Sequence, residues 1–243
     1  MAAQSSKPKE TRKPSLVKDG ELRSFGRVAA RMSPAELAEL DELLAAYTLD
    51  ESVFDSQRPI HLEIGAGNGA QIFERAKADP EGAYIACEVF KNGLLKLLRQ
   101  IHKAQLTNIY VVAADARDVL ENISEGRLRE VRLLYPDPWH KRKHHKRRIV
   151  NEDFIASTAQ PLAVGGRLLM VTDITSYAYW MLERMMGKVG RQYYTPQAIS
   201  PEEWAQPPVG WLPTKYEQKA RREGRKSWYF TFIRHNEDKG GAK

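Results

Sequence analysis

The alternation of short apolar runs with amphipathic stretches from residue 60 onward constrains the fold of this 243-residue chain more than any other feature. The pattern predicts strands at residues 60–64, 83–88, 109–113, 131–135 and 167–172. The stretches between them predict helices near residues 70–78, 91–104, 116–122 and 151–162. Strands that alternate with crossover helices form a mainly parallel sheet with helices on both faces, and ligands bind beyond the carboxyl ends of its strands. We therefore expect an α/β fold whose functional residues follow the strands.

The segments on either side of this region complete the predicted domain. Ser33 and Pro34 favour the start of a helix, because serine is a good N-cap and proline suits the first turn. Toward the other end we predict a helix at 177–186, a Pro- and Trp-rich loop at 196–213 and a strand at 227–234. We expect a disordered basic arm at 1–18, one domain over 19–236 and a flexible tail at 237–243.

Composition excludes several classes of protein. No apolar run approaches the roughly 18 to 20 residues that cross a bilayer, and the polar start lacks the hydrophobic stretch of a signal peptide. The single cysteine, Cys87, rules out a disulfide framework. His140, His144 and His145 lie close together, but neither carboxylates nor cysteines complete a metal-ligand set around them. We expect a soluble, cytoplasmic protein without a membrane partner or a metal, and both a monomer and a homodimer remain open.

The positive charge of the chain is concentrated in two places. The formal net charge is +7, and residues 141–148 alone carry six positive charges. Residues 1–31 hold a further excess of Lys and Arg, which leaves the remainder slightly acidic. Six positive charges in eight residues repel one another unless a polyanion relieves them. The distribution therefore favours a nucleic-acid partner over an ordinary solvated surface.

A strand that runs directly into a glycine-rich turn marks a candidate cofactor site. Residues 62–69 read Leu-Glu-Ile-Gly-Ala-Gly-Asn-Gly and precede a predicted helix, an arrangement that lets a cofactor approach bare backbone. With Ala70 the turn also matches the dinucleotide-binding pattern G-x-G-x-x-A, and Glu88 lies about 20 residues further on. A dehydrogenase is therefore an alternative interpretation of this stretch.

Carboxylates at three successive strand ends favour a cationic methyl donor instead. Glu63 stands just before the glycines, where it would repel a pyrophosphate but not a sulfonium amino acid. Glu88 and Asp115 end the next two predicted strands. Taken singly each acid has a structural alternative, and Asp115 in particular fits a helix N-cap. Together they suit S-adenosylmethionine.

The fourth predicted strand leads into Pro136-Asp137-Pro138-Trp139, directly before the basic run. The two prolines hold a fixed, non-helical turn, and the indole can stack on a base. Asp137 is expected to face the same cleft as the other strand ends.

Four motifs together closely resemble the bacterial tRNA (guanine-N7-)-methyltransferases. They are the glycine motif, the Pro-Asp-Pro-Trp turn with its basic run, Val171-Thr172-Asp173 and Pro213-Thr214-Lys215-Tyr216-Glu217, and the resemblance spans roughly residues 20 to 235. It implies a Rossmann-like S-adenosylmethionine-dependent methyltransferase fold with a mainly parallel seven-stranded sheet. It also implies methyl transfer from S-adenosylmethionine to N7 of a guanine in the variable loop of tRNA.

The resemblance implies roles for individual residues. Asp137 would be catalytic, at the reaction centre. The methyl donor would be held by Glu63, Gly65, Gly67, Glu88 and Asp115. The substrate would contact Lys141, Asp173, Thr214, Lys215, Tyr216 and Glu217. RNA phosphates are expected along the basic run, at Arg142, Lys143, His144, His145, Lys146, Arg147 and Arg148.

Alternatives remain for part of this assignment. Thr214 and Glu217 have the spacing of a capping box, so both are equally explained as the start of a helix that carries Lys219, Arg221 and Arg222. A non-catalytic RNA-binding protein would share the basic surfaces, and a methyltransferase for another RNA or for a small molecule would share the fold and the donor site. Donor binding and methyl transfer to tRNA distinguish these functions.

Overall fold

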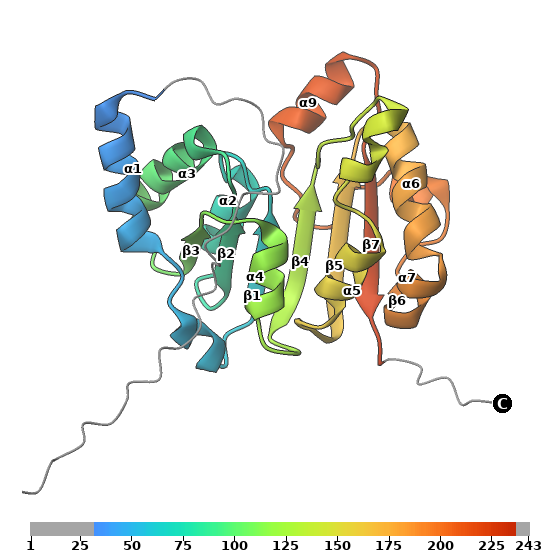
Figure 1. Ribbon diagram of the computed structural model, residues 1–243, viewed down its shortest axis with the longest axis horizontal. Coiled ribbons are helices and arrows are strands. Elements are labelled where there is room, and N and C mark those ends of the chain that lie inside the picture. Colours follow the sequence, from blue (N-terminus) through green and yellow to red (C-terminus); the bar gives the residue numbers. More distant parts are fainter. Residues whose placement is uncertain (1–31, 237–243) are drawn as a thin grey trace, which may run out of the picture.

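The computed structural model describes residues 32–236, which form one seven-stranded sheet with helices on both faces (Figure 1). The strand order is β3-β2-β1-β4-β5-β7-β6. The first five strands are parallel, and β7 is antiparallel to both β5 and β6. The strands are β1 (Ile60–Ile64), β2 (Ala83–Cys87), β3 (Ile109–Val112), β4 (Leu128–Leu134), β5 (Leu162–Thr172), β6 (Tyr194–Pro196) and β7 (Trp228–Arg234). The predicted α/β class is confirmed.

Alternate residues of the strands pack against two sets of helices. On one face Tyr84 and Ala86 join the core formed by α1 (Pro34–Tyr47), α2 (Ala70–Ala78) and α3 (Lys91–Ala104). On the other, Ile85 and Leu133 join the core of α4 (Ala116–Asn122), α5 (Glu152–Ala159), α6 (Thr175–Met185) and α7 (Lys188–Tyr193). The shorter elements are the 3-10 helices η1 (Glu51–Asp55) and η2 (Arg142–Arg147) and the helices α8 (Pro201–Trp204) and α9 (Lys215–Arg222). Within residues 32–236 no helix is both long and apolar enough to cross a membrane.

Local sequence signals account for most of these elements. Ser33 caps α1 through a reciprocal capping box, in which its side chain accepts from Glu36 N at 3.2 Å and Glu36 Oε2 accepts from Ser33 N at 2.8 Å. The predicted strands and helices are all present, with β4 and β5 starting earlier than predicted. The prediction did not include β6, α7 and α8, because three to six residues are too few to show a period. The predicted arm at 1–18 and tail at 237–243 lie outside the described residues.

The strand order places the site. After β1 the chain adds β2 and β3 on one side of it, and then crosses to build β4 and β5 on the other. The loops that follow β1 and β4 therefore diverge at their carboxyl ends, which is where ligands bind in open α/β sheets.

Candidate active site

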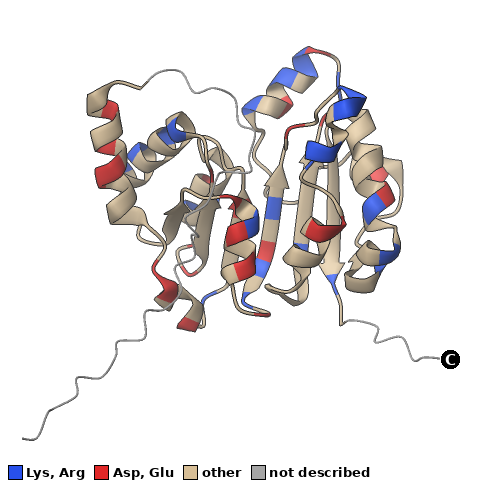
Figure 2. Ribbon diagram, viewed as in Figure 1, with Lys and Arg blue, Asp and Glu red and all other residues tan. Residues whose placement is uncertain are grey.

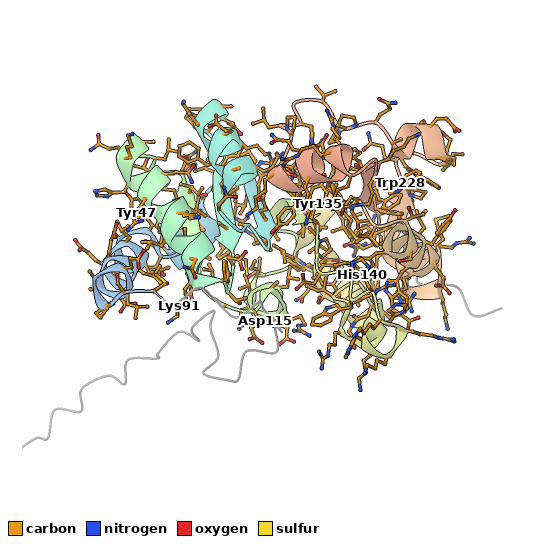
Figure 3. All side chains as sticks on the ribbon, turned by 90° about the horizontal axis from the view of Figure 1, so that it is seen from above. Tyr47, Lys91, Asp115, Tyr135, His140 and Trp228 are labelled. Carbon is orange, nitrogen blue, oxygen red and sulfur yellow. The ribbon has the colours of Figure 1, made fainter. Side chains whose placement is uncertain are left out.

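A cleft of about 1230 Å³ opens at the carboxyl ends of the five parallel strands. Seen from above, Asp115, Tyr135 and His140 gather over this edge, with Lys91 on one side and Trp228 on the other (Figure 3). Every parallel strand is followed by predicted site residues that line the cleft: Gly65 and Gly67 after β1, Glu88 after β2, Asp115 after β3, Asp137 after β4 and Asp173 after β5. The structure therefore brings together residues that are far apart in the sequence.

The glycine turn presents bare backbone to the cleft. Gly65 and Gly67 have φ of +70° and +59°, in the left-handed region that glycine adopts without strain. A Cβ added at Gly65 would meet no atom within 4 Å, because the position faces open space. A Cβ added at Gly93 of α3 would come within 2.6 Å of the Gly67 carbonyl oxygen. Two glycines thus leave room for a ligand, and a third lets α3 pack directly behind the turn.

Glu88 ties the end of β2 to this turn. Its Oε2 accepts a hydrogen bond from Gly67 N at 2.6 Å, and its Oε1 accepts from the backbone of Val89 and Phe90 at 2.8 and 2.9 Å. The carboxylate is half-buried and lines the cleft. It therefore fixes the shape of the turn and still offers acceptor oxygens to a ligand hydroxyl.

Asp115 caps the helix that follows it and also lines the cleft. It caps α4 by accepting from Arg117 N at 3.0 Å, and its carboxylate also accepts from Arg117 Nε at 2.9 Å and Nη2 at 2.7 Å. The residue lines the cleft although it is only 5% exposed. Its role as a cap is therefore compatible with donor binding.

Glu63 lies behind the cleft wall instead of on it. The residue is 2% exposed. Of the residues in β1, only Ile64 lines the cleft. The register partner of Glu63 on β4 is Arg132, and Glu63 Oε2 has no hydrogen-bond partner among the described residues. Burial raises the pKa of Glu63 to about 7, against the opposing effect of the positive charges of Arg132 and Arg75. The structure thus places Glu63 behind the cleft, and its contact with the methyl donor stays a prediction.

The Pro-Asp-Pro-Trp turn carries an unusual backbone. Tyr135 and Trp139 have φ of +50° and +46°, values that bulky L residues rarely adopt. Tyr135 N continues the sheet by donating to Val171 O at 2.8 Å, and its hydroxyl lies 2.9 Å from Ser227 Oγ. Asp137 lies two residues after Tyr135 and is exposed to the cleft.

A second carboxylate, Asp173, follows β5 on the same side of the cleft. Arg225 donates to Asp173 Oδ2 from Nε at 2.9 Å and from Nη2 at 2.7 Å. Arg225 comes from the segment between α9 and β7. Asp173 is therefore charge-compensated, whereas no described residue forms an ion pair with Asp137.

The basic run splits into three groups. His140, Lys146, Arg147 and Arg148 line the cleft, and Lys141, Arg142 and Lys143 are exposed beside it. His144 and His145 pack on the rings of Trp139 and Trp180, with centroids 6.0 and 5.6 Å apart. Arg148 differs from its neighbours in the basic run because it is only 2% exposed, and its contact with RNA phosphate stays a prediction.

The predicted substrate residues 214–217, at the start of α9, also fall into two groups. Lys215 and Tyr216 line the cleft, and Tyr216 stacks on Tyr135 with ring centroids 5.7 Å apart. Thr214 instead caps α9 by accepting from Glu217 N at 3.0 Å. The Glu217 carboxylate is 1% exposed and bonds to Trp211 Nε1 at 2.6 Å and to Arg221. Thr214 therefore acts as the N-cap of α9, and the buried Glu217 stabilises the same helix through Trp211 and Arg221.

Positively charged side chains are concentrated on the elements that border the cleft. Figure 2 shows Lys and Arg of η2 and α9 at the edge of the sheet where the cleft opens, whereas α1 is mainly acidic.

No group of three His, Cys, Asp or Glu within residues 32–236 is arranged to hold a metal ion. The sequence did not single out three further cleft residues, Asn92, Lys96 and Arg117. Arg117 lies two residues after Asp115, but the other two show no signal before the chain is folded.

Comparison with known proteins identifies close relatives. A family model described as "Putative methyltransferase" matches residues 57–230. The chain is 40% identical over 177 residues to a tRNA (guanine-N(7)-)-methyltransferase of Agrobacterium fabrum, covering 73% of this chain and 75% of the relative. It is 38% identical to the protein of the same name from Aeromonas hydrophila, covering 88% of this chain and 93% of the relative.

Solved structures show the same fold at low sequence identity. A 16S rRNA (adenine(1408)-N(1))-methyltransferase from Catenulisporales acidiphilia, with cosubstrate SAM, matches with a TM-score of 0.51 and 12% identity, over 82% of this chain and 92% of that one. An rRNA methylase from Streptococcus thermophilus matches with a TM-score of 0.50 and 14% identity, over 86% and 100% of the two chains. The Rossmann-like methyltransferase fold predicted from the sequence is confirmed.

Proposed function

This chain belongs to the tRNA (guanine-N(7)-)-methyltransferase family, and we propose that it transfers a methyl group from S-adenosylmethionine to N7 of a guanine in the variable loop of tRNA. The observation that carries this proposal is the cleft itself, where a glycine turn, uncompensated Asp137 and basic side chains of η2 and α9 meet. We further propose that the enzyme acts in the cytoplasm.

The cleft residues fit the methyl donor. Gly65 offers bare backbone facing open space, and Glu88 and Asp115 line the same wall. Carboxylates at this wall favour a ligand that carries a positive charge and hydroxyl groups. When bound, S-adenosylmethionine supplies an electrophilic methyl group on a sulfonium. Gly65, Gly67, Glu88 and Asp115 would hold it, and Glu63 supports the turn from behind.

Asp137 provides the electrostatic contribution at the acceptor. Guanine N7 has an in-plane lone pair and no proton, so no general base is required. The protein must orient the base and stabilise the positive charge that develops on it. Asp137 is exposed to the cleft without an ion-pair partner, whereas Arg225 offsets the charge of Asp173. Asp137 therefore stabilises the cationic guanine, and Asp173 acts as an oriented hydrogen-bond acceptor.

The rim of the cleft binds the RNA backbone. Lys146, Lys215 and Lys219 line it from η2 and α9. Phosphate neutralisation releases counterions, so the affinity for tRNA falls with added salt. A small-molecule methyltransferase has no use for such a rim.

The proposal is tested with labelled S-adenosylmethionine and two transcripts of one tRNA. The first transcript is unmodified, and the second carries 7-deazaguanosine at the variable-loop guanines and so lacks the nucleophilic nitrogen. We expect transfer to the first transcript and none to the second. Equal transfer to both would contradict N7 of a variable-loop guanine as the acceptor.

A further inference from the structure

Asp137 depends on its turn for its position. No described residue donates a hydrogen bond to its carboxylate, and it projects from the middle of the turn into the cleft. Tyr135 and Trp139 on either side both have positive φ. Such a backbone persists only where the surrounding structure holds it in place. Some group must therefore fix the turn between Asp137 and Trp139.

Arg148 makes this contact from below. Its Nε donates a hydrogen bond to the Pro138 carbonyl oxygen at 2.8 Å. The side chain is 2% exposed, and its guanidinium carbon lies 4.8 Å from the ring centroid of Tyr177 and 4.9 Å from that of Trp180. The residue directly follows η2, so one side chain connects the basic run to the turn.

The two rings that hold Arg148 are themselves fixed. Tyr177, on α6, is fully buried in the core. Trp180 donates from Nε1 to the Val150 carbonyl oxygen at 2.7 Å. The guanidinium therefore has little freedom, and the position of Pro138 is set by the packing of α6 against the sheet.

The surroundings of Arg148 argue against a purely stabilising role. None of the ion pairs among residues 32–236 includes Arg148, and its Nη2 is buried without a hydrogen-bond partner. A buried cation without a carboxylate is costly, and ring faces offset only part of that cost. Unfavourable burial of this kind concentrates at functional sites.

We propose that Arg148 is a positioning residue that holds the Pro138 carbonyl and thereby places Asp137 for methyl transfer. The proposal rests on the function given above. It is an alternative to the prediction from sequence, in which Arg148 binds RNA phosphate. The two roles differ in their effect on catalysis and on salt dependence.

The test compares Arg148→Lys with Lys146→Gln in the full-length chain, by steady-state kinetics on tRNA at several salt concentrations. Lysine keeps the positive charge but has neither the Nε donor nor the planar group that stacks on two rings. We expect Arg148→Lys to lower kcat on the order of 10²-fold, with KM for tRNA and the salt slope unchanged. Lys146→Gln should raise KM and reduce the salt slope by about one. A higher KM and a smaller slope for Arg148→Lys would overturn the positioning role.

A second variant and two further measurements control for misfolding and for the assay. Trp180→Leu removes one of the rings and leaves the guanidinium present, so it should also lower kcat without changing KM. Retained donor affinity establishes that each variant is folded. Amide hydrogen exchange at residues 137–141 should become faster in Arg148→Lys, and unchanged exchange together with unchanged kcat refutes the role. No transfer by the wild type contradicts the proposed function, and the exchange measurement still decides the role of Arg148.

Discussion

Arg225 donates two hydrogen bonds to a single oxygen of Asp173, from Nε at 2.9 Å and from Nη2 at 2.7 Å. The contact joins the segment after α9 to the end of β5, and both side chains are partly buried at the cleft. Because both bonds end on Oδ2, Oδ1 has no hydrogen-bond partner within residues 32–236. The ion pair thus fixes the carboxylate while one oxygen stays available to the substrate.

The first prediction concerns this ion pair. Arg225→Ala leaves Asp173 without its two donors, so we expect kcat/KM for tRNA to fall roughly tenfold, as for loss of a hydrogen bond to a charged group. In an Asp173→Asn background the same substitution should have little further effect, because the partner is already altered. The measurement is a double-mutant cycle on kcat/KM. Additive losses would show that Arg225 acts on RNA phosphate instead.

Arg222→Ala is the matched control for that cycle. Arg222 is exposed on α9, three residues away, and among residues 32–236 its side chain donates only to the Gln218 carbonyl oxygen. We expect its effect to be confined to KM and to be independent of Asp173.

The second prediction concerns the donor site. Glu88 accepts three backbone hydrogen bonds, including the one at 2.6 Å that holds Gly67. Glu88→Gln replaces one acceptor oxygen by a donor, so the turn loses part of its support. We expect the dissociation constant for S-adenosylmethionine to rise about tenfold or more, as measured by calorimetry. Glu74→Gln, exposed on α2, is the control, and equal affinities for both variants would contradict the assignment.

The third prediction concerns pH and Glu63. Burial raises its pKa from 4.5 to about 7, so the folded state keeps this proton over a range where the unfolded state has lost it. Stability from the neutral carboxyl is therefore lost as pH rises from about 4.5 to 7, by roughly 3 kcal/mol. Glu63→Gln does not titrate. We expect its free energy of unfolding to rise relative to the wild type by that order between pH 4.5 and 8.

Chemical denaturation at several pH values measures this difference. Other titrating groups are common to both proteins and cancel. A difference that stays constant with pH would show that Glu63 is ionised throughout, held by Arg132 and Arg75.

Sequence patterns predicted the sheet and most of the cleft for a physical reason. Parallel strands place their following residues at one edge, so Gly65, Glu88, Asp115, Asp137 and Asp173 converge wherever the strand order puts them. The pattern does not encode which way a side chain turns once a strand ends. Glu63 illustrates this limit, since it is buried behind the cleft-lining Ile64, which the strand pattern did not show.

Burial of charged residues was the other feature that the sequence could not reveal. Arg148 and Glu217 look like surface residues in a basic run and on a polar helix. They are buried because Tyr177 and Trp180 enclose the first, and Trp211 and Arg221 hold the second. Each depends on contacts between distant segments, which local periodicity does not contain.

The most direct test maps the methylated base. Unmodified tRNA is incubated with S-adenosylmethionine and either the wild type or Asp137→Asn, and then cleaved chemically at N7-methylguanine. The account predicts wild-type cleavage at a variable-loop guanine and a rate lower by roughly 10²–10³ for Asp137→Asn, as for loss of a preorganised transition-state contact. Cleavage at the same guanine with an unchanged rate for Asp137→Asn would contradict the central role of this carboxylate.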